Sequence, residues 1–209
     1  MNLDDSIRNY LDDISSSNPT PGGGNVSAFS GAMACSLGIM VCSLTIGKKK
    51  YAEVEEEMKD IKFELSVAKE EFLNLAEKDN QAFEKVMNSF KLPKDTDEQK
   101  KTRSESIEAG TLEAAEAPSE VLHYCGKIIP LFQTLAEKGN QNSVSDAGVA
   151  AALISTAAEG AYLNVLINCF SLSNQTVAGE ILKKNEIILS EVTQLSQFIS
   201  SEIKRKLHK

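Results

Sequence analysis

Apolar residues recur at spacings of three and four along most of the chain, which is the pattern of amphipathic helices. This spacing predicts helices over residues 6–15, 53–91 and 175–207. The long second helix has no glycine or proline before Pro93. No segment shows the alternating, β-branched pattern of a strand. The chain is therefore predicted to be all-α.

Prolines divide the pattern in the middle of the chain. Apolar positions over 97–115 stop before Pro118, and proline is favoured in the first turn of a helix. We therefore predict that a new helix starts at 117–120. Pro130 predicts a kink in that helix, because its apolar positions continue through Leu135.

Two segments break the amphipathic pattern because they are almost without charge. Residues 26–46 carry none, and residues 149–172 carry only Glu159. Both are rich in glycine, alanine and serine, and a helix without a polar face is one buried on all sides. Their length also permits a membrane span, but the small polar residues favour a core helix. We expect one domain over residues 1–209, a helical bundle with two buried, small-residue-rich central helices.

Each uncharged segment follows a flexible polar stretch, called here the first elbow (residues 18–25) and the second elbow (residues 139–148). In the first, Pro19 and Pro21 restrict the backbone and three glycines follow. The N–H groups at the start of a helix favour an anionic or carbonyl-bearing ligand. The alternative is a tight turn with a helix cap. We expect the two elbows to form two walls of one site.

Charge and cysteine content narrow the class of protein. A net charge of −8 and a pI near 4.9 argue against binding to nucleic acid or to an anionic membrane. Met1–Asp5 lack the basic start of a signal peptide, so we expect a cytoplasmic protein. The four cysteines have no metal-ligand spacing, and we expect them to be buried and reduced. No metal site is predicted.

The residue types available for catalysis are few. No phosphate-binding or dinucleotide-binding loop is present, and His123 and His208 are the only histidines. Carboxylates, lysines, amides and backbone N–H groups remain. Asp146 in the second elbow is either a helix N-cap or a site acid. Asp79, between core-facing residues, is either solvated or a general base.

Two further groups have a structural and a functional interpretation. Lys48, Lys49 and Lys50 follow Gly47 and either complement the end of a helix or bind carboxylates. Asn164 and Asn168 are spaced as neighbours on one helix face. Their amides either cross-link helices or bind a ligand.

Motifs spread over nearly the whole chain resemble the cyclodeaminase/cyclohydrolase family of tetrahydrofolate one-carbon enzymes. They are Pro19-Thr20-Pro21-Gly22-Gly23-Gly24, Gly31-Ala32-Met33-Ala34, Leu44-Thr45-Ile46-Gly47-Lys48-Lys49-Lys50-Tyr51, Asp79 with Ala82-Phe83 and Val86-Met87, Leu92-Pro93-Lys94, Gly139-Asn140, Ser145-Asp146-Ala147-Gly148-Val149-Ala150-Ala151 and Asn164-Val165-Leu166-Ile167-Asn168. Asn25 departs from the pattern, in which serine or alanine is expected.

The resemblance implies an all-helical homodimer with a folate site formed by the elbows, near or across the subunit interface. It implies no metal or organic cofactor. One reaction in the family hydrolyses 5,10-methenyltetrahydrofolate to 10-formyltetrahydrofolate. The other closes formiminotetrahydrofolate to the methenyl form and releases ammonia. Both pass through a tetrahedral carbon between two nitrogens.

On this resemblance we assign roles to the candidate residues. Asp79 and Asp146 are the catalytic candidates, one as general base and the other stabilising the cationic one-carbon bridge. Pro21, Gly22, Gly23 and Gly24 are expected to contact the pterin or the one-carbon bridge, and Asn140, Asn164 and Asn168 to provide amide contacts. Lys48, Lys49 and Lys50 are expected to bind the glutamate tail, so the expected substrates include polyglutamylated folates.

A chain without an attached formiminotransferase favours the cyclohydrolase. The cyclodeaminase is the alternative. A folate-binding or scaffold protein without turnover is the alternative from another class.

Overall fold

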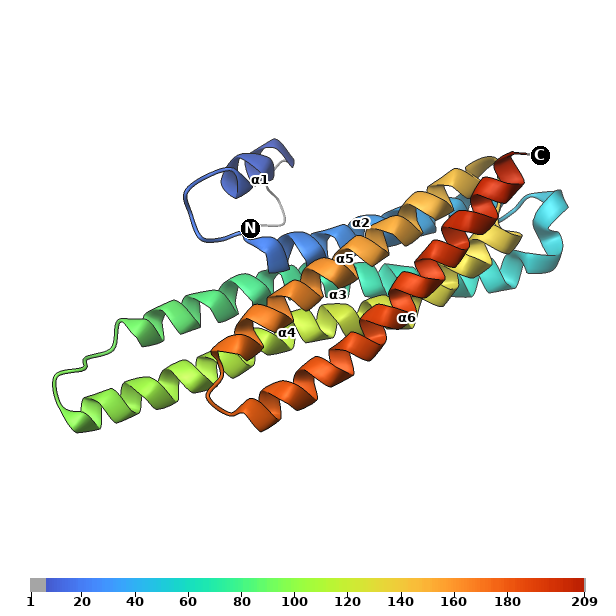
Figure 1. Cartoon of the computed structure of the whole chain (residues 1–209). Coiled ribbons are helices and arrows are strands. Elements are labelled where there is room, and N and C mark those ends of the chain that lie inside the picture. Colours follow the sequence, from blue (N-terminus) through green and yellow to red (C-terminus); the bar gives the residue numbers. More distant parts are fainter. Residues whose placement is uncertain (1–6, 209) are drawn as a thin grey trace.

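The helices form largely where the apolar spacing predicts them. The computed structural model describes residues 7–208. Met1–Ser6 lie outside the described residues, and with them the segment on which the prediction about a signal peptide rests and the first residue of the predicted first helix. Figure 1 shows an elongated bundle of long helices with a short one beside it. The elements are α1 (Ile7–Ile14), α2 (Gly23–Thr45), the 3-10 helix η1 (Lys49–Val54), α3 (Glu55–Phe90), α4 (Asp97–Lys138), the 3-10 helix η2 (Gln141–Ser143), α5 (Val144–Ser171) and α6 (Gln175–Leu207).

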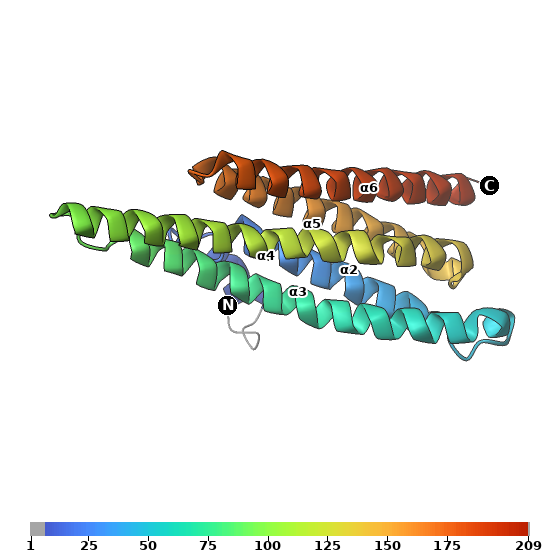
Figure 2. The same ribbon diagram turned by 90° about the horizontal axis from the view of Figure 1, so that it is seen from below.

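One hydrophobic core joins the long helices. The helix α2 packs mainly on α3 and α5, and α4 packs on α3, α5 and α6. Figures 1 and 2 show these helices running side by side along the length of the molecule. Buried side chains from α2 to α6 form a single cluster, and the described residues contain no strand. The chain is thus a single all-helical domain.

Small residues of α2 allow α3 to approach closely. A Cβ atom added to Gly31 would lie 2.7 Å from the ring of Phe72, and one added to Gly38 would lie 2.6 Å from Leu65. At the start of α2, Gly24 faces Asp79 of α3 in the same way. These three pairs show that α2 and α3 run antiparallel, with the glycines along their contact.

The two uncharged helices are covered on only part of their circumference, which corrects the prediction that they are buried on all sides. The helix α2 leaves Met33, Met40 and Leu44 exposed, and α5 leaves Val149 and Phe170 exposed. Both helices have the length and composition of a membrane span, yet both pack in the bundle. The exposed side chains lie where the bundle supplies no neighbouring helix.

The prediction of a helix start at Pro118 is wrong. The helix α4 runs unbroken through Pro118 and Pro130. Proline lacks the N–H that would bond the carbonyl four residues earlier, here that of Ala114. The side chain of Asn168 replaces it, because its Nδ2 donates to the Ala114 carbonyl at 2.9 Å. A contact from α5 thus stabilises α4 where its own sequence indicates a break.

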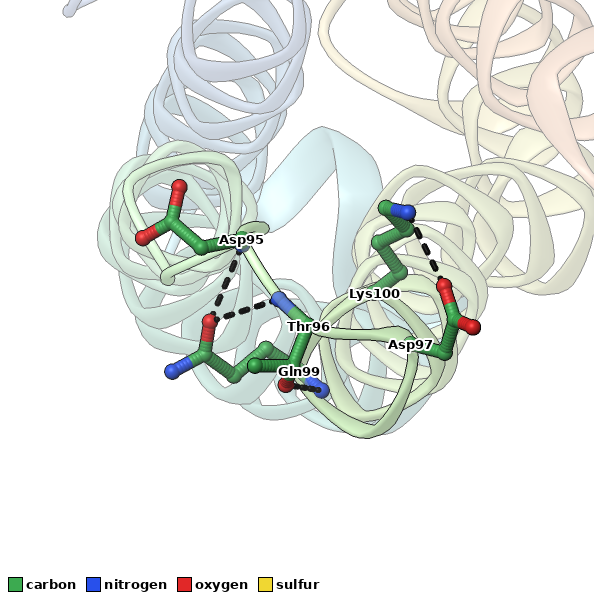
Figure 3. Close-up of polar contacts among 5 residues, drawn as sticks. All are labelled: Asp95, Thr96, Asp97, Gln99 and Lys100. Atoms are coloured by element: carbon green, nitrogen blue, oxygen red, sulfur yellow. Dashed lines mark hydrogen bonds and ion pairs between the residues drawn. The ribbon is translucent and has the colours of Figure 1, made fainter.

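The beginning of α4 is set by local chemistry, which Figure 3 shows. The hydroxyl of Thr96 accepts from the N–H of Gln99, and the Gln99 side chain accepts from the N–H of Asp95 at 2.9 Å and of Thr96 at 3.2 Å. Lys100 pairs with Asp97 at 2.9 Å one turn on. This capping box begins the helix at a sharply defined residue.

The four cysteines are buried and free, as predicted. Burial raises the pKa of the Cys35 thiol to about 12. A thiol held neutral in this way is inert as a nucleophile.

Candidate active site

The first elbow delivers the chain directly into the N-terminus of α2. Gly22 is the N-cap and the helix starts at Gly23, three residues before the uncharged segment predicted over 26–46, so the last glycines of the elbow form its first turn. Gly22 has no side chain that could cap this end, so backbone N–H groups of the first turn are available for partners from other helices or for a ligand. Pro21 and Gly22 are half-buried beside them.

The carboxyl group of Asp79 lies against the backbone of this first turn. A Cβ atom added to Gly24 would lie 2.1 Å from Oδ1 of Asp79 and 2.7 Å from Oδ2. Any side chain at position 24 would therefore displace the carboxylate. The close approach explains why a glycine is needed here, and it joins the first elbow to α3.

Burial and a hydrogen bond act on the Asp79 carboxyl in opposite directions. Burial raises its pKa, and the backbone N–H of Asn25 lowers it, with burial the larger effect. The partial positive charge at the start of α2 also favours the anion. Asp79 is thus a partly desolvated carboxylate with a fixed donor, which suits a general base.

The side chain of Asn25 is fully buried behind this carboxylate. Its Oδ1 accepts from the Tyr10 hydroxyl at 2.7 Å, and its Nδ2 donates to the Ala76 carbonyl at 2.8 Å. The departure from the expected serine or alanine therefore ties α1, α2 and α3 together.

The two asparagines of α5 have different surroundings. A Cβ atom added to Gly23 would lie 3.4 Å from Nδ2 of Asn164, so Asn164 lies at the first elbow. Its Nδ2 donates to the Gly160 carbonyl. Asn168 uses its Nδ2 on the carbonyls of Ala114 and Asn164. The amide nitrogen of Asn168 thus acts as a cross-link between helices.

A second cluster lies at the opposite end of α2. Asn140 is buried, donates from Nδ2 to the Leu44 carbonyl at 2.9 Å, and donates from its backbone N–H to Thr45 Oγ1. Gly47 has a positive φ of 79°, which stops the helix as predicted. The three lysines that follow are exposed, and none of them forms an ion pair within the described residues: Lys48, Lys49 and Lys50.

Tyr51 connects these lysines to the second elbow. Its hydroxyl accepts from the N–H of Gln141 at 3.0 Å and donates to Asn140 Oδ1 at 3.4 Å. The Gln141 N–H is the main cause that lowers the pKa of the phenol, and Lys50 and Lys48 add to it. We call residues 47–51 the lysine turn. Tyr51 holds this turn against the second elbow.

Asp146 is half-buried in the first turn of α5. It is not the N-cap, a position held by Ser143, which corrects one of the two interpretations of Asp146. Its carboxylate has no hydrogen bond or ion pair to another described residue. It lies within the second elbow at the positive end of a helix, where an anion is favoured.

Within one chain the elbows do not form two walls of one site, contrary to our expectation. Asp79 and Asn164 contact the start of α2, whereas Asn140 contacts its end. The 23 residues of α2 span about 34 Å. The reason is that α2 and α5 run antiparallel, which places their N-terminal elbows at opposite ends (Figure 1).

A separate apolar hollow of about 510 Å³ lies between the end of α5 and the start of α6. Leu163, Ile167 and Phe170 line it together with residues of α6, and no carboxylate or basic side chain does. This hollow therefore offers no group for acid–base chemistry, in contrast to Asp79 at the start of α2 and Asp146 in the second elbow.

Comparison with known proteins shows the family of this chain. The family model described as formiminotransferase-cyclodeaminase matches residues 6–186. The chain belongs to this family. A methenyltetrahydrofolate cyclohydrolase from Methylorubrum extorquens is 39% identical over 98% of both chains.

Other members of the formiminotransferase-cyclodeaminase family are also similar. The rat formimidoyltransferase-cyclodeaminase is 29% identical over 98% of this chain, which spans 38% of the length of the rat protein. The crystal structure of a formiminotetrahydrofolate cyclodeaminase from Thermotoga maritima superposes with a TM-score of 0.82 at 32% identity, covering 96% of this chain and 98% of the other.

Two residues of this family member, one at the second elbow and one next to Asp79, were not among those predicted from the sequence to be functional. Tyr51 was part of a matching motif, but its link to the second elbow needed the structure. Asn80, next to Asp79, is buried, and its Oδ1 has no hydrogen-bond partner among the described residues. An unpaired buried acceptor is rare and is often functional, but no sequence signal separates it from an ordinary helix position.

Proposed function

We propose that this protein is a methenyltetrahydrofolate cyclohydrolase, an enzyme that hydrolyses 5,10-methenyltetrahydrofolate to 10-formyltetrahydrofolate. Full-length similarity to the Methylorubrum protein of that name supports the reaction. The observation that carries the mechanism is the Asp79 carboxylate, held against the first turn of α2 by the N–H of Asn25.

The methenyl bridge is a delocalised cation, so a nearby carboxylate both attracts it and activates water. Asp79 accepts a proton as water adds to the bridge carbon, giving a tetrahedral carbon bonded to N5 and N10. The bond to N5 then breaks and N5 retains its electron pair. The hydroxyl proton is transferred to N5 as the formyl C=O forms on N10, so the proton taken by Asp79 is the one that the reaction releases overall.

The first elbow supplies the surface on which the folate ring lies in this proposal. Pro21 and Gly22 to Gly24 leave the backbone bare, so a flat ring can approach the N–H groups of α2. Asn164 borders the same surface from α5. In this proposal the amide oxygen of Asn168 also contacts the folate.

We infer that a homodimer completes the site. The exposed apolar side chains Met33 and Met40 of α2, Phe63 of α3 and Val149 of α5 lie on the elements between the two elbows. Twofold pairing of this face with α2 antiparallel would bring the first elbow of one protomer to the second elbow of its partner. It would also cover α2 and α5, which then become central helices.

In such a dimer the functional groups of the two ends meet. Asp146 and Asn140 of one protomer would face Asp79 of the other, and Lys48 to Lys50 would bind the carboxylates of the folate glutamate tail. Exposed lysines without ion-pair partners suit a polyglutamylated substrate. The reaction as written requires no metal or organic cofactor. We assign the enzyme to the cytoplasm, without nucleic-acid or membrane partners, in keeping with its net charge of −8.

The cyclodeaminase reaction is the second candidate, supported by the Thermotoga maritima structure. There N10 attacks the formimino carbon, the formimino nitrogen gains two protons, one from N10 and one from solution, and leaves as ammonia, and the same methenyl bridge forms. The same carboxylate would take the proton from N10. A folate-binding protein without turnover is the remaining alternative.

One pair of assays separates these functions. Purified protein is added to 5,10-methenyltetrahydrofolate and the loss of methenyl absorbance is followed, after subtraction of spontaneous hydrolysis. The second assay follows methenyl formation and ammonia release from formiminotetrahydrofolate. Accelerated loss in the first assay supports the cyclohydrolase. Turnover in the second assay alone supports the cyclodeaminase, and binding without turnover in either contradicts both enzymes.

A further inference from the structure

Asn25 has only one amide orientation that satisfies both of its neighbours. It is 1% exposed, and its partners are a hydroxyl and a backbone carbonyl. A carbonyl only accepts, so Nδ2 must face Ala76 and Oδ1 must face Tyr10. The Tyr10 hydroxyl is therefore a donor to Asn25. This side chain is locked by one bond from α1 and one from α3.

The same residue presents its backbone to the Asp79 carboxylate. The N–H of Asn25 is the donor to that carboxylate, and the preceding Gly24 is in contact with both carboxylate oxygens. The direction of this N–H depends on the position of residue 25. Two bonds to the side chain thus fix the donor that holds the carboxylate.

Tyr10 itself is the anchor of α1. It is the buried residue of that helix, and its ring lies 4.9 Å from the ring of Phe29. The remaining apolar side chains of α1 are exposed, Ile7 to 71%. Figure 1 shows α1 beside the N-terminal end of α2. The helix α1 is thus joined to the bundle close to the first elbow, through Tyr10.

We propose that Tyr10 is a positioning residue, whose hydroxyl acts through Asn25 to hold the Asp79 carboxylate in place for the reaction. The inference rests on the proposed function for the role of Asp79. The structural coupling from Tyr10 to Asp79 stands on the contacts themselves. It assigns the N-terminal helix a part in catalysis although it contributes no group to the substrate.

The test is Tyr10→Phe, which removes one oxygen and leaves the ring on Phe29. Loss of the donor frees the Asn25 amide and loosens its N–H. We expect kcat to fall about 3- to 30-fold with KM changed less than about twofold, since the substrate contacts are untouched. The acid limb of the pH profile moves to higher pH, because burial of Asp79 persists while its donor weakens. Ile7→Ala changes an exposed side chain of the same helix and is the control. It should leave kcat and the pH profile unchanged.

A readout without substrate separates this inference from the proposed function. Carbon-13 NMR titration of the Asp79 carboxyl is compared in the wild-type protein, Tyr10→Phe and Asn25→Ser. A pKa raised further in both variants supports the coupling even if no folate is turned over. In the Asn25→Ser background, Tyr10→Phe should have no further effect, because the acceptor is already gone. An unchanged Asp79 titration and an unchanged kcat in Tyr10→Phe overturn the inference while the wild-type reaction stands. Asn25→Ser provides the same test if Tyr10→Phe does not fold.

Discussion

Asp79 is placed where burial and a helix N-terminus compete over one carboxyl group. Burial disfavours its anion, and the Asn25 N–H with the start of α2 favours it. Such a balance keeps the carboxylate partly desolvated while a fixed donor favours its anion. It costs the folded protein some stability, as is common for groups retained for function.

Asp79→Asn should separate the contribution of this carboxylate to catalysis from its cost in stability. We expect the cyclohydrolase rate to fall about 10²- to 10⁴-fold, since the amide cannot accept the proton. The free energy of unfolding at neutral pH should stay equal or rise, because a partly buried charge is removed. Steady-state kinetics and urea unfolding measure both.

Asp60→Asn, on the exposed side of the same helix, is the matched control and should leave both quantities unchanged. Near-normal turnover in folded Asp79→Asn and in folded Asp146→Asn would contradict the catalytic assignment of both carboxylates.

The pH dependence follows from the direction of the Asp79 pKa. The pKa is raised above 3.8, so the carboxylate needed as base is lost on acidification at a higher pH than for an ordinary aspartate. We expect kcat/KM to fall as the pH decreases through the raised pKa. For stability the sign is opposite, because the contribution of this group is fully present below 3.8 and is lost as the pH rises through the folded pKa. Measuring kcat/KM and urea unfolding over the same pH range tests the two pH dependences. If the fall of kcat/KM at acidic pH persisted in Asp79→Asn, Asp79 would be excluded as its source.

Among the helices, the contact between α2 and α3 depends on glycine where large side chains cross. Gly31→Ala would place a Cβ atom 2.7 Å from the buried ring of Phe72. We expect a loss of about 1–3 kcal/mol in the free energy of unfolding, because the core must shift. Gly179→Ala is the matched control, since no atom lies within 4 Å of the added Cβ in α6. That change should stabilise by about 0.5–1 kcal/mol, and equal effects of the two would contradict the packing argument.

The helix α4 depends on α5 at Pro118. Asn168→Ala leaves the Ala114 carbonyl without its donor, and we expect a loss of about 1–3 kcal/mol measured by urea unfolding. In a Pro118→Ala background the helix regains its own N–H, so the loss from Asn168→Ala should shrink. Equal losses in the two backgrounds would show that the amide acts elsewhere.

For the whole molecule, the separation of the two elbows makes the dimer proposal testable by mixing variants. Asp79→Asn and Asp146→Asn chains, each weakly active, are coexpressed with different tags. If each site combines Asp79 of one protomer with Asp146 of its partner, half of the chains pair into hybrids that contain one intact site. We expect recovery of roughly one quarter of wild-type activity in the mixture.

Activity no higher than the mean of the separate variants would place both groups in one chain and contradict the shared site. Met40→Glu on the exposed face of α2 is the companion test. It should shift the protein to monomers by sedimentation and lower activity at the same time.

Much of this molecule could be predicted from local pattern. The period of apolar residues predicted α1, α3 and α6 closely, and α6 was predicted to its final boundaries of Gln175–Leu207. The uncharged segment 26–46 predicted α2 to within three residues at its start, and the motifs of the chain indicated the family. Periodicity, capping and motif are properties of neighbouring residues, so a single sequence contains them.

Contacts between distant residues were decided only by the tertiary structure. The amide of Asn168 carries α4 through Pro118, and Tyr10 meets Asn25 across 15 positions. The antiparallel course of α2 and α5 places the elbows far apart in the monomer. These outcomes depend on which surfaces meet once the core has formed. Local spacing determines where helices form, and their packing determines which side chains share a site.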